Sequence, residues 1–188
     1  MDPHVKKMAT VLQMASNEVD GEIYDSVTYE DNGRACEITP ALKANLGGRL
    51  VNIMMFDVPG DKDHFSIVLN ATPRFTLMLR EEVRWDWVLK SLGRVEDHVI
   101  GLPEFDKKYL IGGQPADAVI RYLKRTDIQK WIESLGNFLN LAADAGFMRA
   151  TFPLSPEVGY TVDELRSRVV SLMRLAEVAE GKEPAAQA

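Results

Sequence analysis

Apolar residues recur along the chain at two different spacings, and these spacings separate predicted helices from predicted strands. Residues 3–16 repeat apolar positions three and four apart, which predicts an amphipathic first helix. The same spacing over residues 115–124 and 126–135 predicts a pair of helices. A wide apolar stripe from Thr161 to Glu180 predicts a long final helix. These stretches account for most of the helix expected in the chain.

Two of these helices begin with the pattern of a capping box. Residues 126–129 read Thr-Asp-Ile-Gln and residues 161–164 read Thr-Val-Asp-Glu. In such a box the hydroxyl accepts a backbone N–H in the first turn, and the third following side chain reaches back to the N–H of the cap. We therefore expect Thr126 and Thr161 to be the N-caps of their helices.

Shorter apolar runs bounded by glycine, proline or asparagine predict strands. An Asn-Gly pair at 32–33 lies between two such runs and predicts a tight hairpin. A second hairpin is predicted around residues 144–146, and a short helix over residues 85–92. The predicted strands are residues 23–29, 35–38, 49–56, 65–70, 75–80, 109–111, 138–142 and 147–152.

The order of these elements predicts an α+β fold. We expect a mostly antiparallel sheet with helices packed on one face and a long C-terminal helix. Regular alternation of strand and helix is missing, which disfavours a parallel sheet. Residues 1–181 are expected to form a single domain, with an N-terminal helix, a strand-rich first half and a helix-rich second half. Residues 182–188 are expected to be a flexible polar tail.

Composition and charge narrow the compartment and the partners. The 188 residues include 46% hydrophobic residues, a single cysteine and a formal net charge of −6. The acidic balance argues against a nucleic-acid partner, which normally requires a basic stripe. No signal peptide and no apolar run long enough for a membrane span are visible. We therefore expect a soluble cytoplasmic protein with no membrane association.

The sequence offers little support for catalysis, metal binding or a cofactor. His4, His64 and His98 are far apart and show no metal-ligand spacing, so no metal and no cofactor are expected. No phosphate-binding glycine motif and no nucleophile elbow occur. Cys36 lies in a predicted strand and is interpreted as a structural thiol.

One short stretch concentrates charged and aromatic side chains next to a pair of glycines. Residues 103–111 read Pro-Glu-Phe-Asp-Lys-Lys-Tyr-Leu-Ile, and Gly112-Gly113-Gln114 then lead into a predicted helix whose N-terminus could receive an anion. Glu104 and Asp106 would share a face if this stretch were extended. The alternative is structural, with the carboxylates capping a turn or pairing with Lys107, Lys108 or Arg80. The candidate binding residues are Glu104, Asp106, Lys107, Lys108, Gly112 and Gly113.

The same stretch resembles the signature of an uncharacterised bacterial family, a domain of unknown function. The resemblance spans roughly residues 47–181 and is best from Phe105 onward. It implies a strand-rich first half, then the Phe-Asp-basic-basic-aromatic segment, a helix pair, a short hairpin and a long final helix. Members often carry membrane-spanning segments upstream, and none is visible in this sequence. The resemblance implies no activity and no catalytic residue.

The sequence is compatible with two functional hypotheses. The first is a non-catalytic binding or assembly module that takes a protein partner or self-associates through the wide apolar face of the final helix. The other interpretation of that face is that it simply covers the sheet. The second hypothesis is an enzyme of unrecognised type with a site near Glu104–Asp106 and Gly112–Gln114, which requires a concave pocket there.

Overall fold

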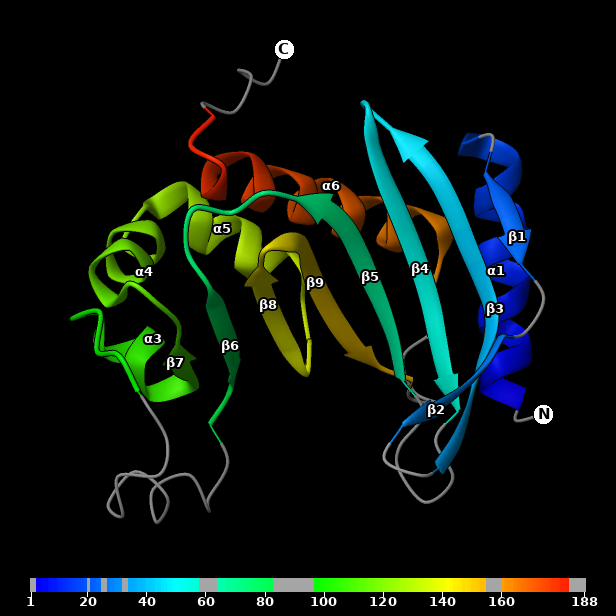
Figure 1. The fold of residues 1–188 in the computed structure, drawn as a ribbon, viewed down its shortest axis with the longest axis horizontal. Coiled ribbons are helices and arrows are strands. Elements are labelled where there is room, and N and C mark those ends of the chain that lie inside the picture. Colours follow the sequence, from blue (N-terminus) through cyan, green and yellow to red (C-terminus); the bar gives the residue numbers. More distant parts are fainter. Residues whose placement is uncertain are drawn as a thin grey trace.

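The computed structural model describes seven stretches of the chain, which together form one sheet and the helices packed on it (Figure 1). They are residues 3–19, 21–24, 27–31, 34–57, 64–82, 97–154 and 160–182. The helices are α1 (Pro3–Val19), α3 (Pro103–Lys108), α4 (Ala116–Leu123), α5 (Thr126–Ser134) and α6 (Val162–Ala179). The predicted helix over 85–92 and most of the predicted tail lie outside the described residues.

A nine-stranded sheet organises the fold. Its strands are β1 (Glu22–Tyr24), β2 (Val27–Asp31), β3 (Arg34–Leu46), β4 (Arg49–Asp57), β5 (His64–Ala71), β6 (Leu77–Glu81), β7 (Tyr109–Gly112), β8 (Asn140–Asp144) and β9 (Gly146–Pro153). They follow the order β1-β3-β4-β5-β9-β8-β6-β7, and β2 also pairs with β3. Every pairing is antiparallel, which confirms the predicted α+β class.

Both predicted hairpins are present, with β2 paired to β3 and β8 paired to β9. Asp31 pairs with Arg34, and the two turn residues between them lie outside the described chain. The turn between β3 and β4 is made by Gly47 and Gly48, whose φ angles of 56° and 78° suit glycine. Strands β5 and β9 pair although they are far apart in the sequence, so the sequence did not predict this pairing. It joins the two halves of the chain.

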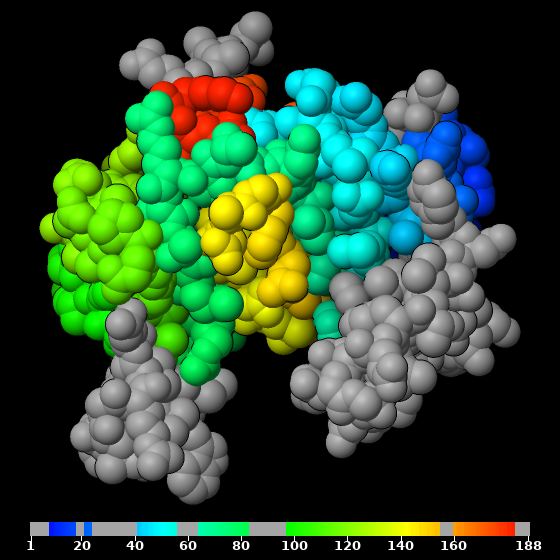
Figure 2. All heavy atoms as spheres, viewed as in Figure 1, coloured from blue at the N-terminus to red at the C-terminus, as the bar shows by residue number. Residues whose placement is uncertain are grey.

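The two faces of the sheet differ in what covers them. One face carries the core and is covered by α1 and α6, which lie on the far side of the strands in Figure 1. On the other face, the strands themselves form the surface that Figure 2 shows. Ser66 and Thr151 are nonetheless buried there, and their hydroxyl groups lie 2.9 Å apart in a hydrogen bond. The prediction of an antiparallel sheet with helices packed on one face is therefore confirmed.

One predicted capping box is correct and the other is wrong. Thr161 caps α6, because its hydroxyl accepts the Glu164 N–H while the Glu164 carboxylate accepts the Thr161 N–H. The N-cap of α5 is Arg125, with no side-chain cap. Gln129 there donates instead to the Leu123 carbonyl, in the helix before it. The spacing of residues 126–129 in the sequence cannot show that the Gln129 side chain has a second possible acceptor in the preceding helix.

The C-terminal end of α6 is fastened to the sheet by a charged cluster around Glu180. Arg49, at the start of β4, donates to both carboxylate oxygens of Glu180, at 2.9 and 2.6 Å. Lys182 and the Thr72 N–H also contact this carboxylate. The Arg49 hydrogen bonds lower the pKa of Glu180 from 4.5 to about 2, although burial opposes them.

This depressed pKa predicts a loss of stability in acid. The folded state holds Glu180 ionised more strongly than the unfolded chain does, so its contribution is complete above pH 4.5 and declines as the pH falls towards 2. One pKa unit corresponds to about 1.4 kcal/mol, so a fall from 4.5 to about 2 corresponds to roughly 3 kcal/mol, most of which the wild type should lose by pH 2.5. Urea unfolding from pH 6 to pH 2.5 measures it. The Glu180→Gln variant should be less stable than the wild type at pH 6, and its free energy of unfolding should fall less steeply between pH 6 and pH 2.5. An equally steep fall in the two proteins would contradict the prediction.

No helix in the described stretches is long and apolar enough to cross a membrane.

Candidate functional site

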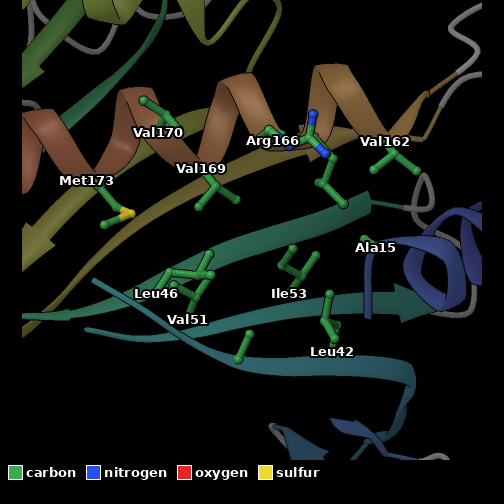
Figure 3. A pocket seen from close by; sticks show the side chains of 12 residues that line it. Ala15, Leu42, Leu46, Val51, Ile53, Val162, Arg166, Val169, Val170 and Met173 are labelled. Atoms are coloured by element: carbon green, nitrogen blue, oxygen red, sulfur yellow. The ribbon is translucent and has the colours of Figure 1, made fainter. Parts of the chain in front are cut away.

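Helices α1 and α6 contact each other on the core face of the sheet but leave a gap beside that contact. Helix α1 packs against β3, whereas α6 packs against β5 and β9. Between them lies an apolar cavity of about 280 Å³, which we call the interhelical cavity (Figure 3). Its lining residues are Ala15 of α1, then Leu42, Ala44, Leu46, Val51 and Ile53 of β3 and β4, and Val162, Leu165, Arg166, Val169, Val170 and Met173 of α6.

Strand periodicity explains the floor of the cavity. Alternate residues of a strand point to one face, so Leu42 and Ala44 of β3 lie on the same side as Val51 and Ile53 of β4. The register pairs Ala44 with Val51 and Leu42 with Ile53, which makes the floor continuous. All four residues are buried. The floor is therefore a sheet surface without polar side chains.

Helical periodicity explains the wall. Val162, Leu165, Val169 and Met173 recur at intervals of three and four and form one stripe of α6. Leu165 and Val169 are buried, whereas Val170 at the rim is 49% exposed. The α6 wall of the cavity thus combines buried side chains with an exposed valine at its rim.

Small residues give the cavity its depth. Ala15 on α1 and Ala44 on β3 stand where larger apolar side chains would fill the space between the helices. Arg166 is the one charged residue among the described lining residues, and its guanidinium donates to Asp163 at 2.9 Å. Figure 3 places Arg166 with Val162 and Ala15 at one end, and Met173 with Leu46 at the other.

A second, polar cavity lies next to the Met173 end. We call it the polar crevice; it measures about 580 Å³ and is lined by Gly47, Gly48, Arg49, Asn70, Ala71, Thr72, Gly146, Glu177, Glu180 and Lys182. It contains the charged cluster around Glu180. Its lining also includes the exposed glycines of two turns, Gly47 with Gly48 and Gly146. Their peptide groups can donate and accept hydrogen bonds, in addition to the charged side chains.

The candidate binding residues predicted from the sequence lie at the opposite end of the sheet. Strands β5, β9, β8 and β6 separate β4 from β7. Residues 103–108 form the short helix α3, so the condition under which Glu104 and Asp106 would share a strand face, an extended segment, is not met. Pro103 occupies a first-turn position of this helix, where its missing N–H costs nothing.

Asp106 has backbone partners. Its carboxylate accepts the N–H groups of Ile100, Gly101 and Leu102, each at 2.9 Å. Such a carboxylate holds the preceding loop against the first turn of α3. The turn-capping alternative considered for Asp106 is therefore the one that the contacts support.

The other candidates do not converge on Asp106. Glu104 and Lys108 border a shallow mixed cavity of about 390 Å³, and Lys107 is exposed. The Lys108 ammonium lies 5.0 Å from the centre of the Tyr109 ring, and a hydrogen bond with Tyr109 raises the pKa of Lys108. Neither Asp106 nor the glycine pair is among the described residues that line this cavity.

The glycine pair serves the junction between β7 and α4. Gly112 pairs with Met78. A Cβ atom on Gly113 would lie 2.1 Å from the Thr76 carbonyl oxygen, at a φ of 137°. The Gln114 N–H donates to the Thr76 hydroxyl at 2.8 Å. These contacts are those of an ordinary strand-to-helix turn.

Sequence reasoning missed the interhelical cavity. The wide apolar face of α6 was expected to pack on the sheet or on a second copy, and most of it packs on the sheet. The two alanines among larger apolar residues were the only local sign of a gap. No group of three or more potential metal ligands is found within the described stretches.

Comparisons with known proteins inform the fold alone. No family model matches the chain, so the resemblance to the uncharacterised bacterial family stays a prediction. No curated protein matches it by sequence. A solved structure, the crystal structure of the mycobacterial trehalose monomycolate transport factor A, is similar with a TM-score of 0.63 and 9% sequence identity. The match covers 96% of this chain and 98% of that one, so the two share their fold over nearly their whole length.

Proposed function

We infer that this protein is a non-catalytic binding module that holds one acyl chain in the interhelical cavity. The observation that carries the proposal is the lining: eleven of its twelve residues are apolar, and the floor is buried yet unfilled. Such a cavity favours an apolar guest, because no lining side chain other than Arg166 can replace the hydrogen bonds of water. The solved structure with the same fold is named as a transport factor for a mycolate, which agrees with an acyl ligand.

The size of the cavity favours a single chain over a helix of a protein partner. If each methylene takes about the 30 Å³ of a water molecule, 280 Å³ accommodates roughly nine of them. One turn of helix about 10 Å across and 5.4 Å long already fills roughly 400 Å³. A partner helix would therefore require α1 and α6 to move apart, whereas an acyl chain fits as the cavity stands.

The expected affinity follows from the buried methylene groups. Nine groups at about 0.8 kcal/mol each contribute roughly 7 kcal/mol. The loss of translational and rotational freedom offsets part of that. The dissociation constant for a ten-carbon chain is thus expected to be about 10 µM or weaker.

Calorimetric titration with 1-decanol tests the proposal. We expect saturable binding to the wild type and at least a tenfold weaker interaction with Ala44→Phe, because the ring occupies the space of the chain. Ala15→Leu fills the same space from α1 and should act in the same direction.

Ala116→Phe is the matched control, since Ala116 lies at the start of α4 and outside the cavity lining. It should leave binding unchanged. Absence of binding to the wild type, or an equal loss in Ala116→Phe, would contradict the proposal. Thermal unfolding of each variant separates blocked binding from a damaged fold.

A further inference from the structure

The polar crevice adjoins the interhelical cavity at the end marked by Met173. Leu46 lines the apolar cavity and the next residue, Gly47, lines the crevice. Met173 and Glu177 are one helical turn apart on α6 and also line the two spaces in turn. We propose that the crevice receives the neutral, hydroxyl-rich headgroup of the amphiphile whose acyl chain occupies the cavity. This inference rests on the proposed function.

A narrow and movable boundary separates the two spaces. The terminal carbon of Met173 lies 3.4 Å from the position of a Cβ on Gly47, in ordinary contact. Methionine is unbranched and has three rotatable bonds, so its side chain can swing aside at small cost. Gly47 has no side chain to add to the barrier. An acyl chain in the interhelical cavity can therefore extend past Met173 and Gly47 into the polar crevice.

The pairing of charges in the crevice favours a neutral headgroup. Its lining holds two cations, Arg49 and Lys182, and two anions, Glu177 and Glu180. Arg49 and Lys182 are both paired with Glu180, at 2.6 and 2.7 Å. Glu177 accepts from Arg174 at 3.0 Å. A charged headgroup would have to compete with these pairs, whereas a neutral one leaves them intact.

Hydroxyl groups match the hydrogen-bonding groups that the crevice offers. Asn70 and Thr72 are exposed at its edge, and the peptide groups of Gly48 and Gly146 line it. This set contains donors and acceptors side by side, and a hydroxyl is both a donor and an acceptor. A sugar or glycerol headgroup can thus bond to several of them at once, which decanol cannot do.

The test compares decyl maltoside, kept below its micellar concentration, with 1-decanol, kept below its solubility limit, by calorimetric titration of the whole chain. Both ligands carry the same chain, so their ratio of affinities isolates the headgroup. We expect the maltoside to bind the wild type about tenfold more tightly, as a few net hydrogen bonds allow. Thr72→Trp, which fills the crevice from an exposed position, should abolish this preference and leave decanol binding unchanged. Thr126→Trp, on exposed Thr126 of α5, is the control and should preserve the preference.

Each outcome separates the two proposals. Equal affinities for the two ligands in the wild type would overturn the headgroup inference and leave acyl binding standing. A preference that survives Thr72→Trp, or disappears equally in Thr126→Trp, would also overturn it. Failure of both ligands to bind would overturn the proposed function itself. Decanoate serves as the charged comparison and should bind less tightly than the maltoside.

Discussion

Replacing Gly113 with alanine is expected to destabilise the protein by at least about 3 kcal/mol, a large part of the 5–15 kcal/mol typical of a folded domain. The added Cβ would lie 2.1 Å from the Thr76 carbonyl oxygen and 2.8 Å from its carbon. Both atoms belong to the backbone leading into β6, so relief requires the strand to move. The φ of 137° adds strain of about 1–3 kcal/mol for any residue with a side chain.

Gly101→Ala is the matched control for this prediction. Its φ of 81° is also unfavourable for alanine, but nothing lies within 4 Å of the added Cβ. We expect it to cost about 1 kcal/mol, so the difference between the variants reports the contact with Thr76. Urea unfolding measures both. Equal losses in the two variants would mean that the close approach of Gly113 to Thr76 is not a constraint.

Asp106→Ala is expected to cost about 3 kcal/mol, because three backbone N–H groups lose a charged acceptor at once. These groups belong to Ile100, Gly101 and Leu102, in the loop before α3. Ile100 is buried, so its N–H has limited access to water as a replacement. Glu104→Ala, on the same helix and exposed, should change stability by no more than about 0.5 kcal/mol.

The Asp106→Ala variant also distinguishes the segment 103–113 from the interhelical cavity as the functional site. Asp106 lies at the β7 end of the sheet and the interhelical cavity at the β3–β4 end. Asp106→Ala that is still folded should therefore bind 1-decanol as the wild type does. A loss of binding in a variant of intact fold would return the functional role to the segment 103–113, as the enzyme hypothesis requires.

Local patterns predicted most elements because their signals are local. The box at Thr161, the hairpin at 144–146 and the apolar stripe of α6 each depend on residues close together in the sequence. Helix α3 was missed because it is only six residues long and depends on Asp106 bonding to the loop before it. The Thr126 box failed because Gln129 has a better partner in the preceding helix.

The interhelical cavity could not be predicted in the same way. The apolar faces of α1, β4 and α6 were visible in the sequence, but the predicted strand over 35–38 stops short of Leu42 and Ala44, which β3 contributes to the floor. The space between these elements also depends on where the two helices lie on the sheet. Helix α6 lies over β5 and β9, which pair although they are far apart in the sequence, and α1 lies over β3. Strand order of this kind is a property of the whole chain.

The most direct test of acyl binding is to locate the chain by nuclear magnetic resonance. Isotope-filtered spectra of labelled protein with unlabelled decyl maltoside report which methyl groups lie near the ligand protons. We predict contacts between the decyl chain and the methyl groups of Val51, Ile53 and Val169, which line the cavity. Contacts confined to Val68 and Met78, on the opposite face of the sheet, or no contacts at any methyl group, would contradict the account.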